Sequence, residues 1–135
     1  MKVVIFNGSP RPHGNTARVI GKICEKMKGY GVDTEAIQVG SHVIHGCRGC
    51  GWCRKSLCGK CVIEEDPVNL WIDKMIRADG ILLASPIYFS GITGQMKAFL
   101  DRAFYVAWAN GGSFRHKTGA SFTVVRRRGA GFMAK

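Results

Sequence analysis

Residues 2–16, KVVIFNGSPRPHGNT, decide the class of fold in this chain of 135 residues. The run from Lys2 to Phe6 is apolar and rich in β-branched side chains, which is typical of a strand buried in a parallel sheet. It ends at Asn7-Gly8-Ser9-Pro10, whose residue types favour a loop. From Thr16 to Lys28 the apolar residues recur with helical period. The stretch therefore predicts a strand, a loop and a helix, in that order.

The same alternation of strands and helices continues along the chain. Further strands are predicted over residues 32–39, 80–85 and 120–125. One further helix is predicted to begin with Asp66 as its N-cap and Pro67 as its first residue, and another is predicted to be capped by Thr93. This order implies a parallel sheet with helices on both faces. The helices are expected to bury Val19, Ile20, Ile23, Cys24 and Met27; Val68, Trp71, Ile72, Met75 and Ile76; and Met96, Phe99, Leu100, Ala103 and Phe104.

Composition predicts one globular domain over residues 1–135, since 46% of the residues are hydrophobic. We expect a cytoplasmic protein, because no apolar run is long enough for a signal peptide or a membrane span. In that compartment clustered cysteines favour metal binding or catalysis over disulfides. The formal charge of +11 would suit nucleic acid, but no nucleic-acid-binding motif accompanies it, so that partner is not predicted.

The loop of residues 9–16, SPRPHGNT, is a candidate phosphate site. Free backbone N–H groups at the start of the following helix attract anions. Ser9, Asn15 and Thr16 add side-chain donors, and Arg11 adds positive charge. The alternative is an ordinary polar turn in which Asn15 or Thr16 caps the helix.

Five of the six cysteines lie in residues 47–61, CRGCGWCRKSLCGKC. Two-residue gaps let thiolates converge on one centre, as in iron–sulfur and zinc sites, and the basic neighbours Arg48, Arg54, Lys55 and Lys60 are expected to lower their pKa values. Zinc could use two CxxC pairs, and a metal-free dithiol is a third alternative. The sixth cysteine, Cys24, is expected in the core. The candidate ligands are Cys47, Cys50, Cys53, Cys58 and Cys61, of which zinc would use all but Cys53.

Three motifs in order, GSPRPHGNT, the cysteine loop ending in CVIEED, and ADGILLASPIYFSGITGQMKAFLDR, resemble the flavodoxin-like NADPH-dependent FMN reductases. Within that family the chain, from Met1 to about Gly131, is similar to the iron–sulfur flavoproteins. The resemblance implies an α/β flavodoxin-like three-layer sandwich with a parallel sheet, and a cysteine-rich metal loop at 46–62. It also implies that Ser9, Arg11, Asn15 and Thr16 hold the FMN phosphate, that Pro86, Ile87, Tyr88, Phe89 and Gly91 line the flavin ring, and that Arg126, in the segment 126–129, approaches the pyrimidine side.

The resemblance also implies the metal ligands and the activity. Cys47, Cys50 and Cys53 match the first three ligands of a [4Fe–4S] cluster. The fourth is either Cys58 or Cys61, and alignment on CVIEED favours Cys61. The implied function is an FMN-dependent oxidoreductase that passes electrons between the cluster, FMN and a small-molecule acceptor. NAD(P)H or a ferredoxin-like protein would be the donor, and no side chain is predicted to be catalytic.

The chain also departs from the family pattern. Flavodoxin-like domains have five strands in the order 2-1-3-4-5, whereas four are predicted here, without the last strand and helix. We therefore expect the fourth strand to have an open edge, which a homo-oligomer would cover. Two alternatives for function stay open: an NAD(P)H-dependent FMN or quinone reductase without a cluster, and a zinc-binding, non-enzymatic module with a basic surface.

Overall fold

A computed structural model describes residues 1–126, which form four strands alternating with helices. The order agrees with the prediction, except for one extra short helix in the cysteine loop. The elements are β1 (Lys2–Asn7), α1 (Asn15–Gly29), β2 (Asp33–Gln38), α2 (Trp52–Ser56), α3 (Val68–Arg77), β3 (Gly80–Pro86), α4 (Gly94–Ala109) and β4 (Thr118–Val124).

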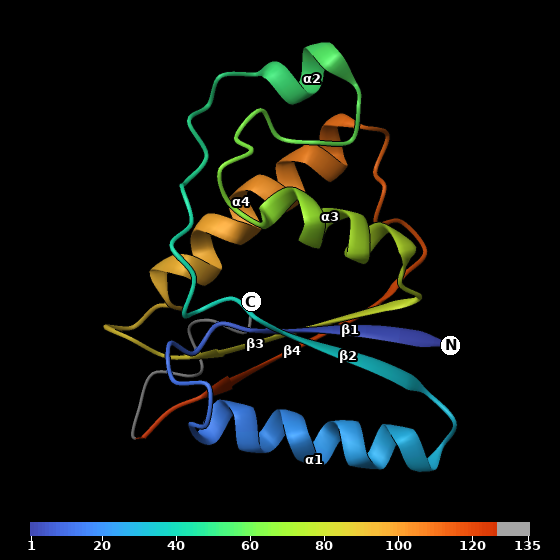
Figure 1. Ribbon diagram of the computed structural model, residues 1–135, viewed down its shortest axis with the longest axis vertical. Coiled ribbons are helices and arrows are strands. Elements are labelled where there is room, and N and C mark those ends of the chain that lie inside the picture. Colours follow the sequence, from blue (N-terminus) through green and yellow to red (C-terminus); the bar gives the residue numbers. More distant parts are fainter. Residues whose placement is uncertain (127–135) are drawn as a thin grey trace.

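The strands form one parallel sheet in the order β2-β1-β3-β4. In its register Val3 lies opposite Thr34 on one side and Gly80 on the other. Helix α1 covers one face of the sheet, and α3 and α4 cover the other (Figure 1). The predicted α/β sandwich with a parallel sheet is therefore confirmed, with the more polar β2 at an edge as expected.

Two apolar cores flank the sheet. On the side of α3 and α4, Phe6 packs against Phe99 with ring centroids 4.7 Å apart, and Trp71 meets Phe99 edge to face at 5.4 Å. On the side of α1, Ile5 and Ile20 are buried, and the partly buried Cys24 packs against them, as predicted for a core cysteine.

Three residues expected in the core are instead exposed: Val19, Ile76 and Phe104. Each lies at the border of its helix's apolar stripe, where helical period alone cannot decide between core and solvent. The start of α3 also differs, because the helix begins at Val68 and Asp66 turns its carboxylate to Arg102. Thr93 does cap α4, since its Oγ1 accepts a hydrogen bond from the backbone N–H of Met96 at 3.4 Å.

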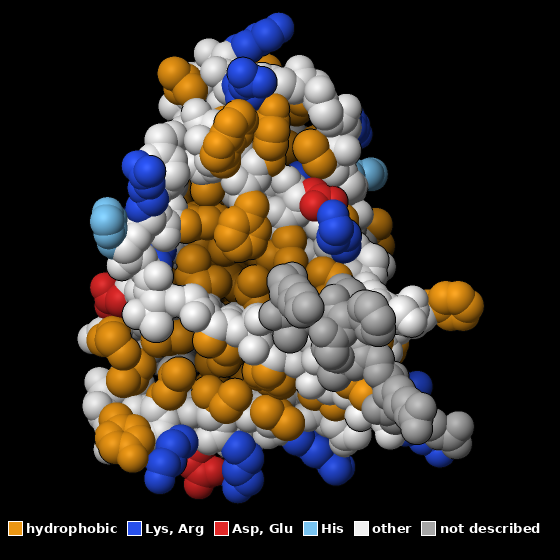
Figure 2. Space-filling view, turned by 180° about the vertical axis from the view of Figure 1, so that it is seen from behind, with side chains coloured by type: hydrophobic (Ala, Val, Ile, Leu, Met, Phe, Trp, Pro, Cys, Tyr) orange, Lys and Arg blue, Asp and Glu red, His pale blue; other side chains and the backbone are white. Residues whose placement is uncertain are grey.

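Within residues 1–126, β4 pairs with β3 on one side and has no strand on the other. Four of its seven residues are exposed, in contrast to β1 and β3. In the view from behind, toward the β4 side of the sheet, apolar side chains gather across the centre of the molecule (Figure 2). Among the same residues, none of the helices has the length and apolar character needed to cross a bilayer.

Candidate flavin and metal site

The carboxyl ends of β1 and β3 are tied together by hydrogen bonds. The N–H of Gly8 donates to the Ala84 carbonyl at 2.7 Å, and the Thr93 hydroxyl donates to the Gly8 carbonyl at 2.6 Å. The Ser85 Oγ in turn accepts from the N–H of Thr93 at 3.2 Å. These bonds hold the two predicted flavin loops side by side, at the carboxyl end of the sheet, where ligands of doubly wound folds bind.

The loop after β1 folds back on itself through Ser9. The Ser9 Oγ accepts from the N–H of Arg11 at 3.1 Å, and the N–H of Gly14 donates to the Arg11 carbonyl at 3.1 Å. The N-cap of α1 is Gly14, and no side chain caps the helix. The alternative in which Asn15 or Thr16 caps α1 is therefore wrong. The first-turn N–H groups remain available to an anion.

The structure brings the four predicted phosphate residues to this one loop and helix start. Ser9 and Thr16 are buried, whereas Arg11 and Asn15 are exposed. The buried Ser9 and Thr16 fix the loop, and the exposed Arg11 and Asn15 can reach a ligand. An anion site needs this arrangement, because the donors are held in place before the ligand arrives. FMN therefore fits the donors of this loop.

The loop after β3 ends in a tight turn at Tyr88-Phe89-Ser90-Gly91. The Tyr88 and Gly91 backbones exchange hydrogen bonds of 2.8 and 3.1 Å, and both central residues are left-handed, with φ of 51° at Phe89 and 67° at Ser90. A phenylalanine rarely adopts this conformation, which costs roughly 1–2 kcal/mol. The turn leaves Phe89 fully exposed and Tyr88 47% exposed. Two aromatic side chains are thus presented to solvent and could cover a flat ring.

The remaining predicted flavin residues lie nearby in the fold. Pro86 ends β3, and the N–H of Ile87 donates to the Val124 carbonyl at 3.1 Å, so this loop adjoins the carboxyl end of β4. Arg126 follows that end and is exposed. The rest of the predicted pyrimidine-side segment, residues 127–129, lies outside the described residues.

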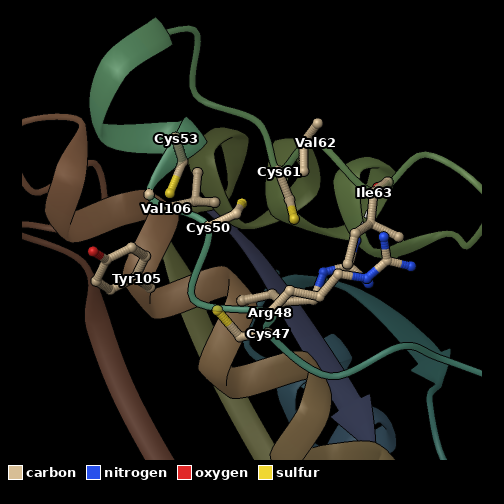
Figure 3. A pocket seen from close by; sticks show the side chains of 11 residues that line it. Cys47, Arg48, Cys50, Cys53, Cys61, Val62, Ile63, Tyr105 and Val106 are labelled. Carbon is tan, nitrogen blue, oxygen red and sulfur yellow. Dashed lines mark hydrogen bonds between the residues drawn. The ribbon is translucent and has the colours of Figure 1, made fainter.

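Four of the five clustered cysteines line one small cavity between the cysteine loop and α4. Figure 3 shows Cys50 and Cys53 on one side of this cavity, Cys61 opposite and Cys47 below. Helix α4 contributes Arg102, Tyr105 and Val106 to the wall. Cys58 is exposed and lines a different surface hollow, beside Asn110 and Gly111. Of the two candidates for the fourth ligand, the fold thus brings Cys61 to the other three.

The donor chemistry of this cavity fits an iron–sulfur cluster, since four cysteines line one space. Within residues 1–126, however, no three His, Cys, Asp or Glu side chains are already arranged to hold a metal ion. A cluster would need the cysteines to turn inward from these positions. Gly49 and Gly51, both left-handed at φ of 64° and 69°, alternate with the ligand candidates and let the loop curl around the cavity.

The thiols differ in acidity in a way that local charge alone does not predict. Burial raises the pKa of Cys53, and the neighbouring Cys61 and Cys50 raise it further because their thiolates would repel its own. The expected lowering of the pKa is therefore wrong for Cys53. It holds for Cys58, where the hydrogen bond from Ser56 is the main cause and Lys60 contributes less.

A buried ion pair, which the sequence analysis missed, supports the cysteine cavity from α4. Arg102 and Asp66 form a salt bridge in which the side chains are 0% and 2% exposed. Burial by itself raises the pKa of Asp66, but hydrogen bonds from Arg102, His45 and Val68 outweigh it and lower the pKa below 3.8. The signal was present in the sequence, because Arg102 lies three residues after Phe99 and four before Val106, at the spacing of the buried stripe.

Other residues missed from the sequence brace the phosphate loop. Asn7 is buried, and its Oδ1 accepts from the N–H of Ser9 at 3.0 Å while its amide donates to Gln38 at 2.7 Å. Gln38 donates to the Ser9 carbonyl. The backbone of Gly40 lies so close to the phosphate loop that a Cβ atom on it would overlap the backbone of Gly8 and Ser9. An asparagine before Gly8 indicated a turn, but nothing in the sequence indicated the approach of Gly40.

Comparison with known proteins agrees with this geometry. The model of the NADPH-dependent FMN reductase family matches residues 1–135. The chain belongs to this family. An iron–sulfur flavoprotein of Methanocaldococcus jannaschii is 37% identical over 97% of the chain and 65% of its own length. One of Methanosarcina thermophila is 33% identical over 97% of the chain and 66% of its own length.

Solved structures support the same fold. A flavone reductase superposes with a TM-score of 0.66 at 22% identity, covering 93% of this chain and 43% of its own. RosB superposes with a TM-score of 0.67 at 20% identity, covering 99% of this chain and 56% of its own. The flavodoxin-like fold and the resemblance to iron–sulfur flavoproteins are thus confirmed. The chain spans somewhat less than two thirds of the length of the curated relatives named above.

Proposed function

We propose that the chain is an FMN-dependent oxidoreductase of the iron–sulfur flavoprotein type. The observation that carries this proposal is the cavity lined by Cys47, Cys50, Cys53 and Cys61 in a chain of the FMN reductase family. The same cavity speaks against the zinc alternative, which needs Cys58 and leaves Cys53 without a role.

When bound, FMN exchanges electron pairs and a [4Fe–4S] cluster exchanges single electrons, so together they link one-electron and two-electron partners. The protein's part is binding and electrostatics. Ser9, Arg11, Asn15 and Thr16 would hold the phosphate, the dipole of α1 adding to their positive potential. Arg126 would supply positive charge where reduced flavin carries negative charge.

In this proposal the loop after β3 covers the flavin ring. Pro86, Ile87 and Gly91 would form its edge, and Tyr88 and Phe89 would shield a face from water. Within residues 1–126, Phe89 combines a left-handed backbone with a fully exposed aromatic side chain. Strain kept at an exposed aromatic residue supports a role in ligand binding.

Helix α4 links the two proposed cofactor sites. Its N-terminus at Gly94 adjoins the flavin loops, and Arg102, eight residues on, lines the cysteine cavity. At 1.5 Å per residue the two points are about 12 Å apart along the helix. The proposed sites are therefore neighbours on one rigid element.

The partners form part of the same proposal. NAD(P)H or a ferredoxin-like protein would be the electron donor, a small molecule the acceptor, and a second copy of the chain would cover the β4 edge. The exposed residues of β4 support the last point. Light scattering on the 135-residue chain tests the assembly, and a monodisperse monomer at working concentration would contradict it.

Anaerobic reconstitution with FMN, iron and sulfide tests the function. We expect about one FMN and four irons per chain, and an absorption spectrum with flavin bands over a broad iron–sulfur shoulder. Flavin bands without iron would indicate a plain FMN or quinone reductase. A colourless chain that takes up zinc but not FMN would indicate the non-enzymatic module.

A further inference from the structure

The guanidinium of Arg102 has one N–H without a partner, inside the protein. Within residues 1–126 its Nε is the one buried side-chain nitrogen or oxygen atom that makes no hydrogen bond. Leaving such a donor unsatisfied costs about 1–3 kcal/mol, and more for a charged group. A partner that the protein itself does not supply would account for it.

The rest of the guanidinium is fixed in place. One terminal nitrogen donates to Asp66 and to the His45 carbonyl at 3.2 Å, and the other donates to the Ile63 carbonyl at 2.9 Å. These bonds connect α4 to both ends of the cysteine loop, before Cys47 and after Cys61. The planar fork therefore cannot turn to satisfy Nε elsewhere.

Arg102 also lines the cavity that Cys47, Cys50, Cys53 and Cys61 surround. Asp66 already balances its charge, so Arg102 would offer a group bound there a rigid N–H donor rather than a free cation. Sulfur atoms of a cluster with four thiolate ligands accept such hydrogen bonds, and these bonds tune reduction potentials.

We propose that the Nε–H of Arg102 donates a hydrogen bond to a sulfur atom of the cluster held by these four cysteines, and that Arg102 is a positioning residue that raises the cluster's reduction potential. The inference rests on the proposed function. The hydrogen bond stabilises the reduced cluster more than the oxidised one, because the reduced cluster carries more negative charge.

The test is a potentiometric titration of the reconstituted chain followed by electron paramagnetic resonance. Arg102→Lys keeps a positive charge for Asp66 but removes the Nε–H and the fork. We expect the ratio of reduced to oxidised cluster at a fixed potential to fall about tenfold, which is about 59 mV for one electron. Arg77→Lys is the matched control, because Arg77 pairs with Asp73 on the exposed surface of α3, and it should leave the ratio unchanged.

A second variant keeps the test decisive if Arg102→Lys does not fold, as judged by circular dichroism. Asp66→Asn combined with Arg102→Gln removes both buried charges together, and we expect a fall in the same direction. Unchanged potentials in folded, iron-loaded variants would overturn the inference and leave the proposed function standing. A wild-type chain that binds no iron would overturn both, and iron analysis before the titration distinguishes that case.

Discussion

Replacing Gly40 with alanine should displace the phosphate loop. The new methyl group would overlap the Gly8 carbonyl and the Ser9 backbone, and none of these atoms belongs to a flexible side chain. Backbone must therefore move, and overpacking of this kind costs about 1–3 kcal/mol of unfolding free energy. The displaced segment carries Ser9, whose hydroxyl holds the N–H of Arg11.

The effect on FMN follows from the same movement. Loss of one hydrogen bond to a charged phosphate costs about 1.5–3 kcal/mol, so the Kd for FMN should rise roughly 10- to 150-fold. Quenching of flavin fluorescence measures this Kd, and urea unfolding measures the stability.

Gly21→Ala is the matched control for this change. Gly21 lies inside α1 with no atom within 4 Å of a Cβ atom built there, so alanine should raise the unfolding free energy by about 0.5–1 kcal/mol and leave FMN binding unchanged. A Gly40→Ala chain with wild-type stability and wild-type Kd would refute the assignment of Gly40 as the support of the phosphate loop.

Three further predictions concern the turn, the α4 cap and the buried ion pair. Phe89→Gly should weaken FMN binding in a flavin titration but change unfolding free energy by less than about 1 kcal/mol, because relief of the left-handed strain offsets the entropy of glycine; unchanged affinity would contradict it. Thr93→Ala should lower the unfolding free energy, measured in urea, by about 1–2 kcal/mol. Thr93→Ser retains the hydroxyl that caps α4 and should keep most of the stability. If both variants lost the same free energy, the hydroxyl would be excluded as the cause. Because the pKa of Asp66 is lower in the folded chain, its contribution is present above pH 3.8 and lost as the pH falls through the folded pKa. Asp66→Asn should therefore lower the unfolding free energy by about 3–5 kcal/mol near pH 7, and its urea midpoint should fall less steeply with pH on the acid side. If the midpoints of wild type and variant changed in parallel with pH, the role of Asp66 would be contradicted.

The order of elements could be predicted from the sequence because buried parallel strands and amphipathic helices leave strong local patterns. Gly80 to Ser85 has no alternation and is an interior strand, as expected. The borders of the apolar stripes could not be predicted from helical period, since Val19 and Phe104 are apolar side chains that the fold leaves exposed.

The candidate site could be predicted only where its residues are close in sequence. The phosphate loop and the cysteine cluster are continuous segments, so their residue types pointed to their chemistry. The spacing of Arg102 on α4 indicated that it is buried, but its partner could not be predicted, because Asp66 lies 36 residues away in the sequence. The same holds for the choice between Cys58 and Cys61, which depends on how the loop returns over α4 after Ser56.

Iron analysis of two matched variants tests the central claim most directly. Cys61→Ser and Cys58→Ser make the same change three residues apart in the same loop, but only Cys61 lines the cavity with Cys47, Cys50 and Cys53. After anaerobic reconstitution we expect Cys58→Ser to retain about four irons per chain and Cys61→Ser to lose most of them. Full iron in Cys61→Ser, with loss in Cys58→Ser, would contradict the account.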